Sequence, residues 1–146
     1  MNEPVTANEI AFGLVLELDQ VALERSAEVH STLPQGIDPD AGPRPGPFVC
    51  TEVDGDSSCW SPLTRIPRVE RLEIPREWKT GGTPQWLNDP TYLNDGANLY
   101  FCTATSVLAA CVEQSAQGER RGVTTAGVDA IRAEVAKQER RQKNPR

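Results

Sequence analysis

Residues 48–60 read FVCTEVDGDSSCW, two short β-prone runs on either side of Asp54-Gly55. Asp-Gly is one of the favoured pairs for a two-residue hairpin loop, so the stretch predicts an antiparallel β-hairpin that continues to about Leu63. A third strand is predicted over residues 68–74, where apolar and polar side chains alternate until Pro75 closes the run. We expect these strands to form a short antiparallel sheet on which the rest of the chain packs.

The hairpin also predicts a pairing of two cysteines. With Asp54-Gly55 as the loop, Cys50 falls directly opposite Cys59 in a non-hydrogen-bonded pair, whose side chains lie close together on one face. We therefore take Cys50 and Cys59 as a disulfide candidate, with two neighbouring free thiols as the alternative. The other two cysteines, Cys102 and Cys111, repeat the same C-x8-C spacing, which differs from the short spacing of zinc ligands. We expect neither a metal nor a cofactor.

The segment before the hairpin predicts a long N-terminal helix from about Ala7 to Val29. Thr6 and Glu9 have the spacing of a capping box, in which each side chain bonds to the backbone amide of the other residue. Polar or small residues recur with a helical period at Glu9, Gly13, Glu17, Gln20, Glu24 and Glu28. A strand is the competing interpretation, because apolar residues alternate at Ile10, Phe12, Leu14, Leu16 and Leu18. The cap and the longer period favour the helix.

Two further helices are predicted on the C-terminal side of the sheet. Residues 99–117 contain a run of small, nearly uncharged residues and predict a closely packed helix that ends at Gly118, a residue favoured just past a helix end. Residues 125–140 predict a third helix with a thin apolar stripe, followed by polar sequence that should project from the body. Before the sheet, residues 35–47 are rich in proline and glycine and read as a connector.

These elements together predict one α+β domain. The chain has 146 residues, which suits a single hydrophobic core. We expect the domain to occupy residues 1–136, with the long N-terminal helix and the small-residue helix packed on the sheet and the third helix projecting. Residues 137–146 form a basic, polar tail.

Charge divides the chain into two unlike parts. Residues 1–118 hold 17 acidic and 7 basic residues, whereas residues 119–146 hold 4 acidic and 8 basic residues. An acidic body repels nucleic acid and anionic membranes, while the basic end can contact either. No apolar run approaches the roughly 18 residues that span a bilayer, and the short run Ile10–Leu16 lacks the flanking features of a signal peptide. We expect a cytoplasmic protein without a membrane partner.

Residues 101–110 read FCTATSVLAA and place Cys102 near the start of the predicted small-residue helix. This run resembles the nucleophile helix of papain-like peptidases, in which a helix N-terminus lowers the pKa of the thiol. The resemblance implies a cysteine-dependent enzyme with Cys102 as its nucleophile. It also requires a histidine base, and the single histidine of the sequence is His30. His30 precedes the cysteine, whereas the base of that family follows it.

The scarcity of acid–base residues leads to the main functional prediction. With one histidine and no phosphate-binding or dinucleotide motif, the chain is expected to be a non-enzymatic interaction or assembly subunit. Its partners are other protein chains in a homo- or hetero-oligomer, and a virion or similar particle is one setting. The predicted partner-binding residues are Val128, Ile131, Val135, Lys137, Arg140 and Arg141. The alternative is the cysteine-dependent enzyme, and a further alternative is a regulator whose basic tail contacts nucleic acid.

Overall fold

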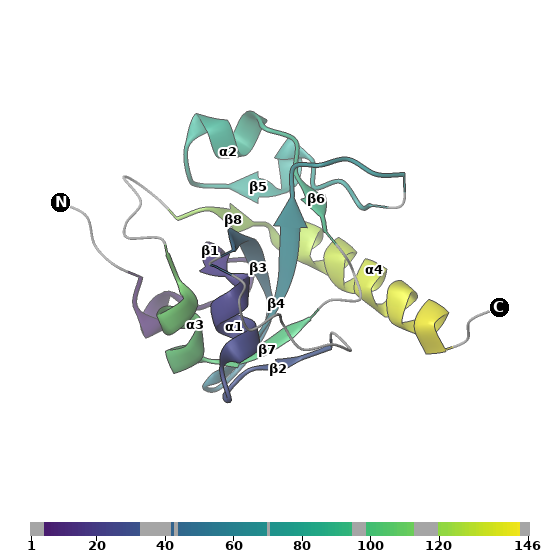
Figure 1. Ribbon diagram of the computed structural model, residues 1–146. Coiled ribbons are helices and arrows are strands. Elements are labelled where there is room, and N and C mark those ends of the chain that lie inside the picture. Colours follow the sequence, from purple (N-terminus) through teal and green to yellow (C-terminus); the bar gives the residue numbers. More distant parts are fainter. Residues whose placement is uncertain are drawn as a thin grey trace.

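The computed structural model describes residues 5–32, 42, 44–69, 71–94, 99–112 and 120–143, with side chains as far as residue 138. Its centre is an antiparallel sheet of six strands (Figure 1). The strands are β1 (Val15–Asp19), β2 (His30–Ser31), β3 (Pro45–Asp54), β4 (Ser57–Thr64), β6 (Tyr92–Leu93) and β7 (Tyr100–Thr103). They lie in the order β1-β3-β4-β7-β2, and β6 pairs with the far end of β4.

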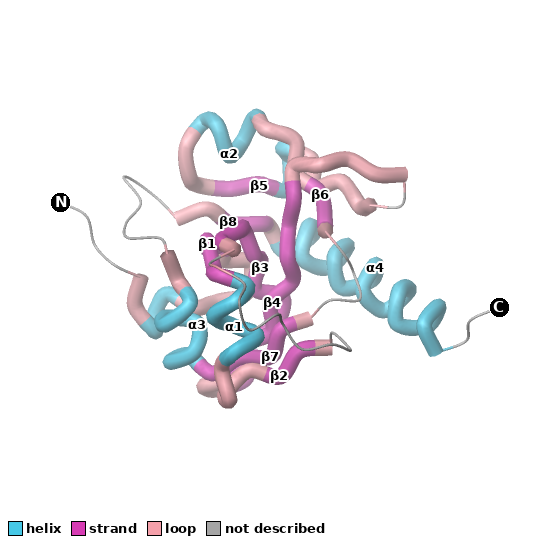
Figure 2. Tube along the Cα trace, in the orientation of Figure 1, coloured by secondary structure: helices cyan, strands magenta, loops and turns pink. Residues whose placement is uncertain are grey.

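Helices cover both faces of this sheet, as the cyan segments of Figure 2 show. The helices are η1 (Ala7–Glu9), α1 (Gln20–Arg25), η2 (Arg76–Trp78), α2 (Pro84–Asn88), α3 (Ala104–Ala110) and α4 (Thr125–Lys143). A separate two-stranded sheet pairs β5 (Lys79–Thr80) with β8 (Gly122–Val123). The mixed α and β class expected from the sequence is confirmed.

The sheet separates two apolar clusters. On one face, α1 and α3 pack against Leu16, Leu18, Phe48, Cys50, Trp60, Tyr100 and Cys102. On the other face, α2 and α4 pack against Val15, Val49, Cys59, Leu63 and Leu93. Because side chains alternate between the faces of a strand, neighbouring residues of β1 and β3 belong to different clusters. Both faces of the central strand β4 are covered, so its residues Ser58–Leu63 are all buried, polar ones included.

The predicted hairpin is confirmed, but its loop lies one residue later than expected. Asp54 pairs with Ser57, so Gly55 and Asp56 are the two loop residues. Gly55 has φ +60° and Asp56 has a negative φ, which is the pattern of a type II′ turn with glycine in its first central position. A β-bulge at Thr51 then shifts the register between Cys50 and Glu52.

The predicted helix over residues 7–29 is wrong, and its competing strand interpretation holds in part. The capping box forms, with the Thr6 amide 2.7 Å from Glu9 Oε2, but it caps only the single turn of η1. Gly13 ends any helix there, because its φ is +90° and its amide donates to the Cys50 carbonyl at 2.8 Å. β1 follows, and α1 occupies only the six residues after it.

Two other predicted elements are shorter than expected. The small-residue helix begins at Ala104 rather than at residue 99, because the residues before it form β7 between β4 and β2. Thr103 caps α3 by accepting a hydrogen bond from the Ser106 amide at 3.2 Å. The expected end at Gly118 lies outside the described residues. In place of the strand predicted over residues 68–74, the described residues of this range form one bridge, between Glu73 and Tyr92.

The proline-rich connector is also shorter than predicted. Residues 33–41 and 43 lie outside the described residues, and Pro45–Pro47 belong to β3, where they pair with β1. The prolines are tolerated because the pairing of β3 with β4 begins only at Phe48, so this end of β3 is bonded on one side. The final helix is confirmed, and its last turns extend beyond the sheet (Figure 1).

Candidate interaction surface

Cys102, the predicted nucleophile, is a core residue of β7. It is 3% exposed and lies among the apolar side chains covered by α1 and α3. Burial raises the pKa of the Cys102 thiol to about 12, and it raises that of Cys50 to the same range. A cysteine nucleophile requires the opposite shift, because only the thiolate attacks.

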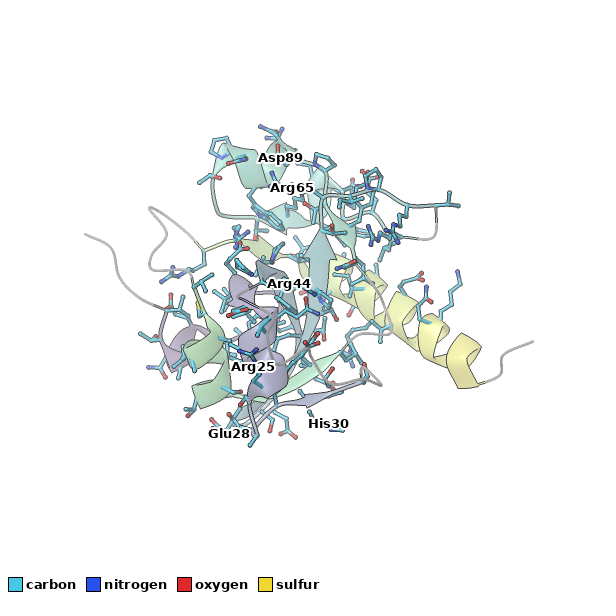
Figure 3. The ribbon with its side chains drawn as sticks, in the orientation of Figure 1. Arg25, Glu28, His30, Arg44, Arg65 and Asp89 are labelled. Carbon is cyan, nitrogen blue, oxygen red and sulfur yellow. The ribbon has the colours of Figure 1, made fainter. Side chains whose placement is uncertain are left out.

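His30 lies close to Cys102 in the sheet but on the other face. β2 pairs with β7 so that His30 is directly opposite Phe101, and their ring centroids are 6.2 Å apart. Directly opposed residues share a face, and the next residue of a strand points to the other face. The imidazole and the thiol are therefore separated by the sheet itself. Figure 3 shows His30 at the outer edge of the molecule.

The predicted pairing of Cys50 with Cys59 is wrong. The shifted loop and the bulge place Cys50 opposite Trp60 and Cys59 opposite Glu52, which puts the two thiols in different apolar clusters. None of the four cysteines forms a disulfide. Within the described residues, no group of three or more histidine, cysteine or acidic side chains is placed to hold a metal ion.

The predicted partner-binding stripe of α4 serves the core of its own chain. Val128, Ile131 and Val135 are buried against the sheet, which corrects the expectation that they contact a partner. A thin stripe is sufficient for this role, because α4 lies on the sheet along one side only. Lys137 is exposed, while the side chains of Arg140 and Arg141 lie outside the described part of the chain. Contact of this basic end with nucleic acid stays a prediction.

The structure presents a different surface, the loop Arg65–Val69 that follows β4. Every residue of this 65–69 loop is exposed. Ile66 is 61% exposed and the side chain of Val69 is fully exposed, although both are β-branched apolar residues of the kind usually buried. Arg65 and Arg68 accompany them. The loop therefore offers apolar contact area beside two guanidinium groups.

Arg71 holds the 65–69 loop in shape. Its Nε donates to the Asn94 carbonyl at 3.0 Å, one terminal nitrogen donates to the Ile66 carbonyl at 2.6 Å, and the other donates to Asn94 Oδ1 at 2.8 Å. The Arg71 amide also donates to the Arg68 carbonyl at 3.0 Å. A planar guanidinium that bonds two segments leaves little freedom to the loop between them. The apolar side chains are thus exposed on an ordered loop.

Arg65 connects the 65–69 loop to the end of α2. It lies 3.3 Å from the Asp89 carboxylate, and Figure 3 shows the two side chains above the sheet. Asp89 also uses its carbonyl to accept from Lys79 Nζ at 2.6 Å. Lys79 is buried, donates a second hydrogen bond to the Trp86 carbonyl at 2.9 Å, and sits 4.6 Å from the Trp86 ring centroid. Burial lowers the pKa of Lys79, although the charges of Asp89 and Glu73 act in the opposite direction.

Sequence reasoning missed this loop because residues 68–74 alternate like a strand. One signal was present: five of the seven basic residues of residues 1–118 fall between Arg65 and Lys79. A local excess of arginine beside Ile66-Pro67, directly after a strand, indicates an exposed turn rather than another buried strand.

The loop offers contact area and positive charge rather than a nucleophile or a general base. No helix within the described residues has the length and apolar character needed to cross a membrane. No family model matches the chain, and no curated protein or solved structure shows significant similarity to it.

Proposed function

We propose that this chain works by contacting other protein chains, as an interaction or assembly subunit, and that the 65–69 loop is the surface it uses. One observation carries the proposal: Ile66 and Val69 are exposed on a loop that Arg71 holds in place. Exposed apolar side chains cost nothing to desolvate on binding and gain about 25 cal/mol per Å² of area removed from water. An ordered loop also loses little conformational entropy when it binds.

The positive charges of the 65–69 loop indicate what kind of surface the partner presents. Arg68 lies between Ile66 and Val69 in the sequence, and Arg65, which contacts Asp89, precedes them, so a surface that carries carboxylates beside an apolar patch fits the loop. The cytosol is the compartment we propose, because four cysteines that form no disulfide, three of them buried, suit a reducing environment.

Site-specific photo-crosslinking in the producing cell tests the proposal. A benzoylphenylalanine residue replaces Val69 in one variant and Phe12, which is exposed on another part of the molecule, in the control variant. We expect the Val69 variant alone to form a defined adduct with a protein chain, to be identified by mass spectrometry. The identified chain, once purified, should bind the wild-type protein and bind Ile66→Ser at least about tenfold more weakly. Equal adducts at both positions, or no adduct at either, would refute the proposal.

A further inference from the structure

Strand β4 lies between two exposed segments of opposite charge. At one end is the 65–69 loop. At the other is the hairpin tip, residues 52–57, all of which are exposed. Figure 1 shows the two ends at opposite sides of the molecule. β4 has eight residues, so at about 3.3 Å per residue its ends are roughly 23 Å apart and cannot meet within one molecule.

The hairpin tip repeats the pattern of the loop with the charges reversed. Val53 is a β-branched apolar residue that is 41% exposed. Glu52 and Asp54, its neighbours in the sequence, point to the opposite face of β3, and Asp56 lies in the turn. Glu52 lies 3.7 Å from Arg132, whereas within the described residues neither Asp54 nor Asp56 forms an ion pair. The exposed tip therefore carries an apolar side chain on one face, carboxylates on the other and Asp56 at its end, so a loop that contacts the tip end-on meets both kinds of group.

Both ends are held in shape before any contact forms. The tip is closed by its type II′ turn, and the Asp56 carbonyl accepts a hydrogen bond from the Ala104 amide at 3.0 Å. The loop is held by Arg71. Two ordered surfaces of opposite charge pay a smaller entropic cost of association than two flexible ones.

We propose that the 65–69 loop of one molecule binds the hairpin tip of a second copy of this chain. The inference rests on the proposed function, since it names the occupant of the same loop. The two surfaces are different, so the contact is heterologous, and each bound molecule still offers one unused end. Copies join head to tail into a ring if the rotation closes and into an open filament if it does not.

A protein occupant is favoured over a lipid surface by the charge of the whole chain. The chain has a net charge of −6, so an anionic bilayer repels it at long range even though the loop is basic. A second copy has the same net charge, but its hairpin tip meets the loop with an exposed apolar side chain as well as with carboxylates.

The contact is small and depends on charge, which sets the conditions of the test. The loop has five residues and the tip has six, well below the 20–30 residues that each side of a standard interface has, so a weak and concentration-dependent association is expected. Exposed charges are screened over about 10 Å at 0.1 M salt and about 3 Å at 1 M salt. The weight-average mass should rise with concentration at low salt and fall to that of the monomer at high salt.

Sedimentation velocity of the full chain and two one-sided variants tests the inference. The loop variant carries Ile66→Ser and Arg68→Ser, and the tip variant carries Val53→Ser and Asp54→Ser. Each should be monomeric alone, because it lacks one of the two surfaces. Their mixture should form a one-to-one dimer, because the intact tip of the loop variant binds the intact loop of the tip variant. The dimer should not grow further, because its two remaining surfaces are the mutated ones. Arg76→Ser and Asp129→Ser are exposed, charge-matched controls that should assemble like the wild type.

Several outcomes would overturn the inference. One is a wild-type chain that stays monomeric up to about 1 mM, where a contact of even −4 kcal/mol would be populated. If such a monomer is crosslinked at Val69 to a different protein, the second copy is the wrong occupant while the proposed function stands. If it instead binds vesicles of anionic lipid, or shows no crosslink, both proposals fail. Circular dichroism and urea unfolding of each variant exclude misfolding as the reason for a monomer.

Discussion

Replacing Arg71 tests whether the 65–69 loop owes its order to one guanidinium group. Arg71→Ala removes three hydrogen bonds, two to Asn94 and one to the Ile66 carbonyl, without touching any exposed residue of the loop. The side chain is half-buried, so part of its interaction with the loop is screened by water. The perturbation should therefore open the loop locally and leave the two apolar clusters intact.

The expected magnitude follows from the hydrogen bonds. A net contribution of about 0.5–1.5 kcal/mol each gives about 1.5–4.5 kcal/mol for three bonds. The lower half of that range applies, because water can reach the freed acceptors, and we take about 2 kcal/mol. Since 1.4 kcal/mol is a factor of ten, the population of the open loop should rise roughly 30-fold.

Limited trypsin digestion measures that population at the Arg68–Val69 bond. When opening is fast compared with cleavage, the cleavage rate follows the fraction of open molecules. We expect cleavage roughly 30-fold faster in Arg71→Ala and an intermediate rate in Arg71→Lys, whose ammonium reaches fewer acceptors than the planar fork. Arg76→Ala is the matched control, because it removes one exposed bond, to Asn88 Oδ1 at 3.0 Å, elsewhere. An Arg71→Ala rate within about twofold of wild type would refute this account of the loop.

Three further predictions concern the core. The pKa values of Cys50 and Cys102 are raised from 9.0 to about 12, so the stability they contribute is complete below about pH 9 and lost as the pH rises toward 12. The free energy of unfolding, measured with urea, should fall above pH 9, by at most about 1.4 kcal/mol per thiol per pH unit, and a Cys50→Ala/Cys102→Ala variant should show a flatter pH profile. Gly13→Ala should cost more than about 2 kcal/mol in urea unfolding, since its Cβ would meet a backbone carbonyl of β8 at φ +90°, whereas Gly46→Ala, with open space around it, should cost under about 1 kcal/mol. Lys79→Met should destabilise by about 1–3 kcal/mol, because two backbone carbonyls near the end of α2 lose their donor; an equally stable variant would mean that the cost of burying the ammonium outweighs both bonds.

The elements that the sequence predicted correctly are those with local causes. The glycine of the Asp54-Gly55 pair marks the hairpin because few other residues adopt the positive φ of its loop. α4 begins at Thr125 as its apolar spacing indicates, and the cap between Thr6 and Glu9 forms although it closes only one turn. Each of these features depends on residues within a few positions of one another.

The errors share a different cause, which is packing by distant segments. Apolar residues occupy four of the five positions 14–18, Glu17 being the exception, and the sequence alone does not say whether a helix or a strand buries them. They form a strand because the sheet has a helical layer on each face, so both faces of β1 are covered. In the same way, the β-bulge at Thr51 decides which cysteine faces which cluster. Counting residues outward from the turn does not predict this bulge.

The candidate site follows the same division. The sequence by itself determined the mixed class, the hairpin, the final helix and the uneven charge, because these depend on local conformation and composition. Tertiary structure alone decided that Cys102 and His30 lie on opposite faces, that the stripe of α4 is core, and that Ile66 and Val69 remain outside. The physical reason is that burial depends on the packing of the whole molecule. An apolar residue is part of the core if another segment covers it, and it is contact surface if no segment does.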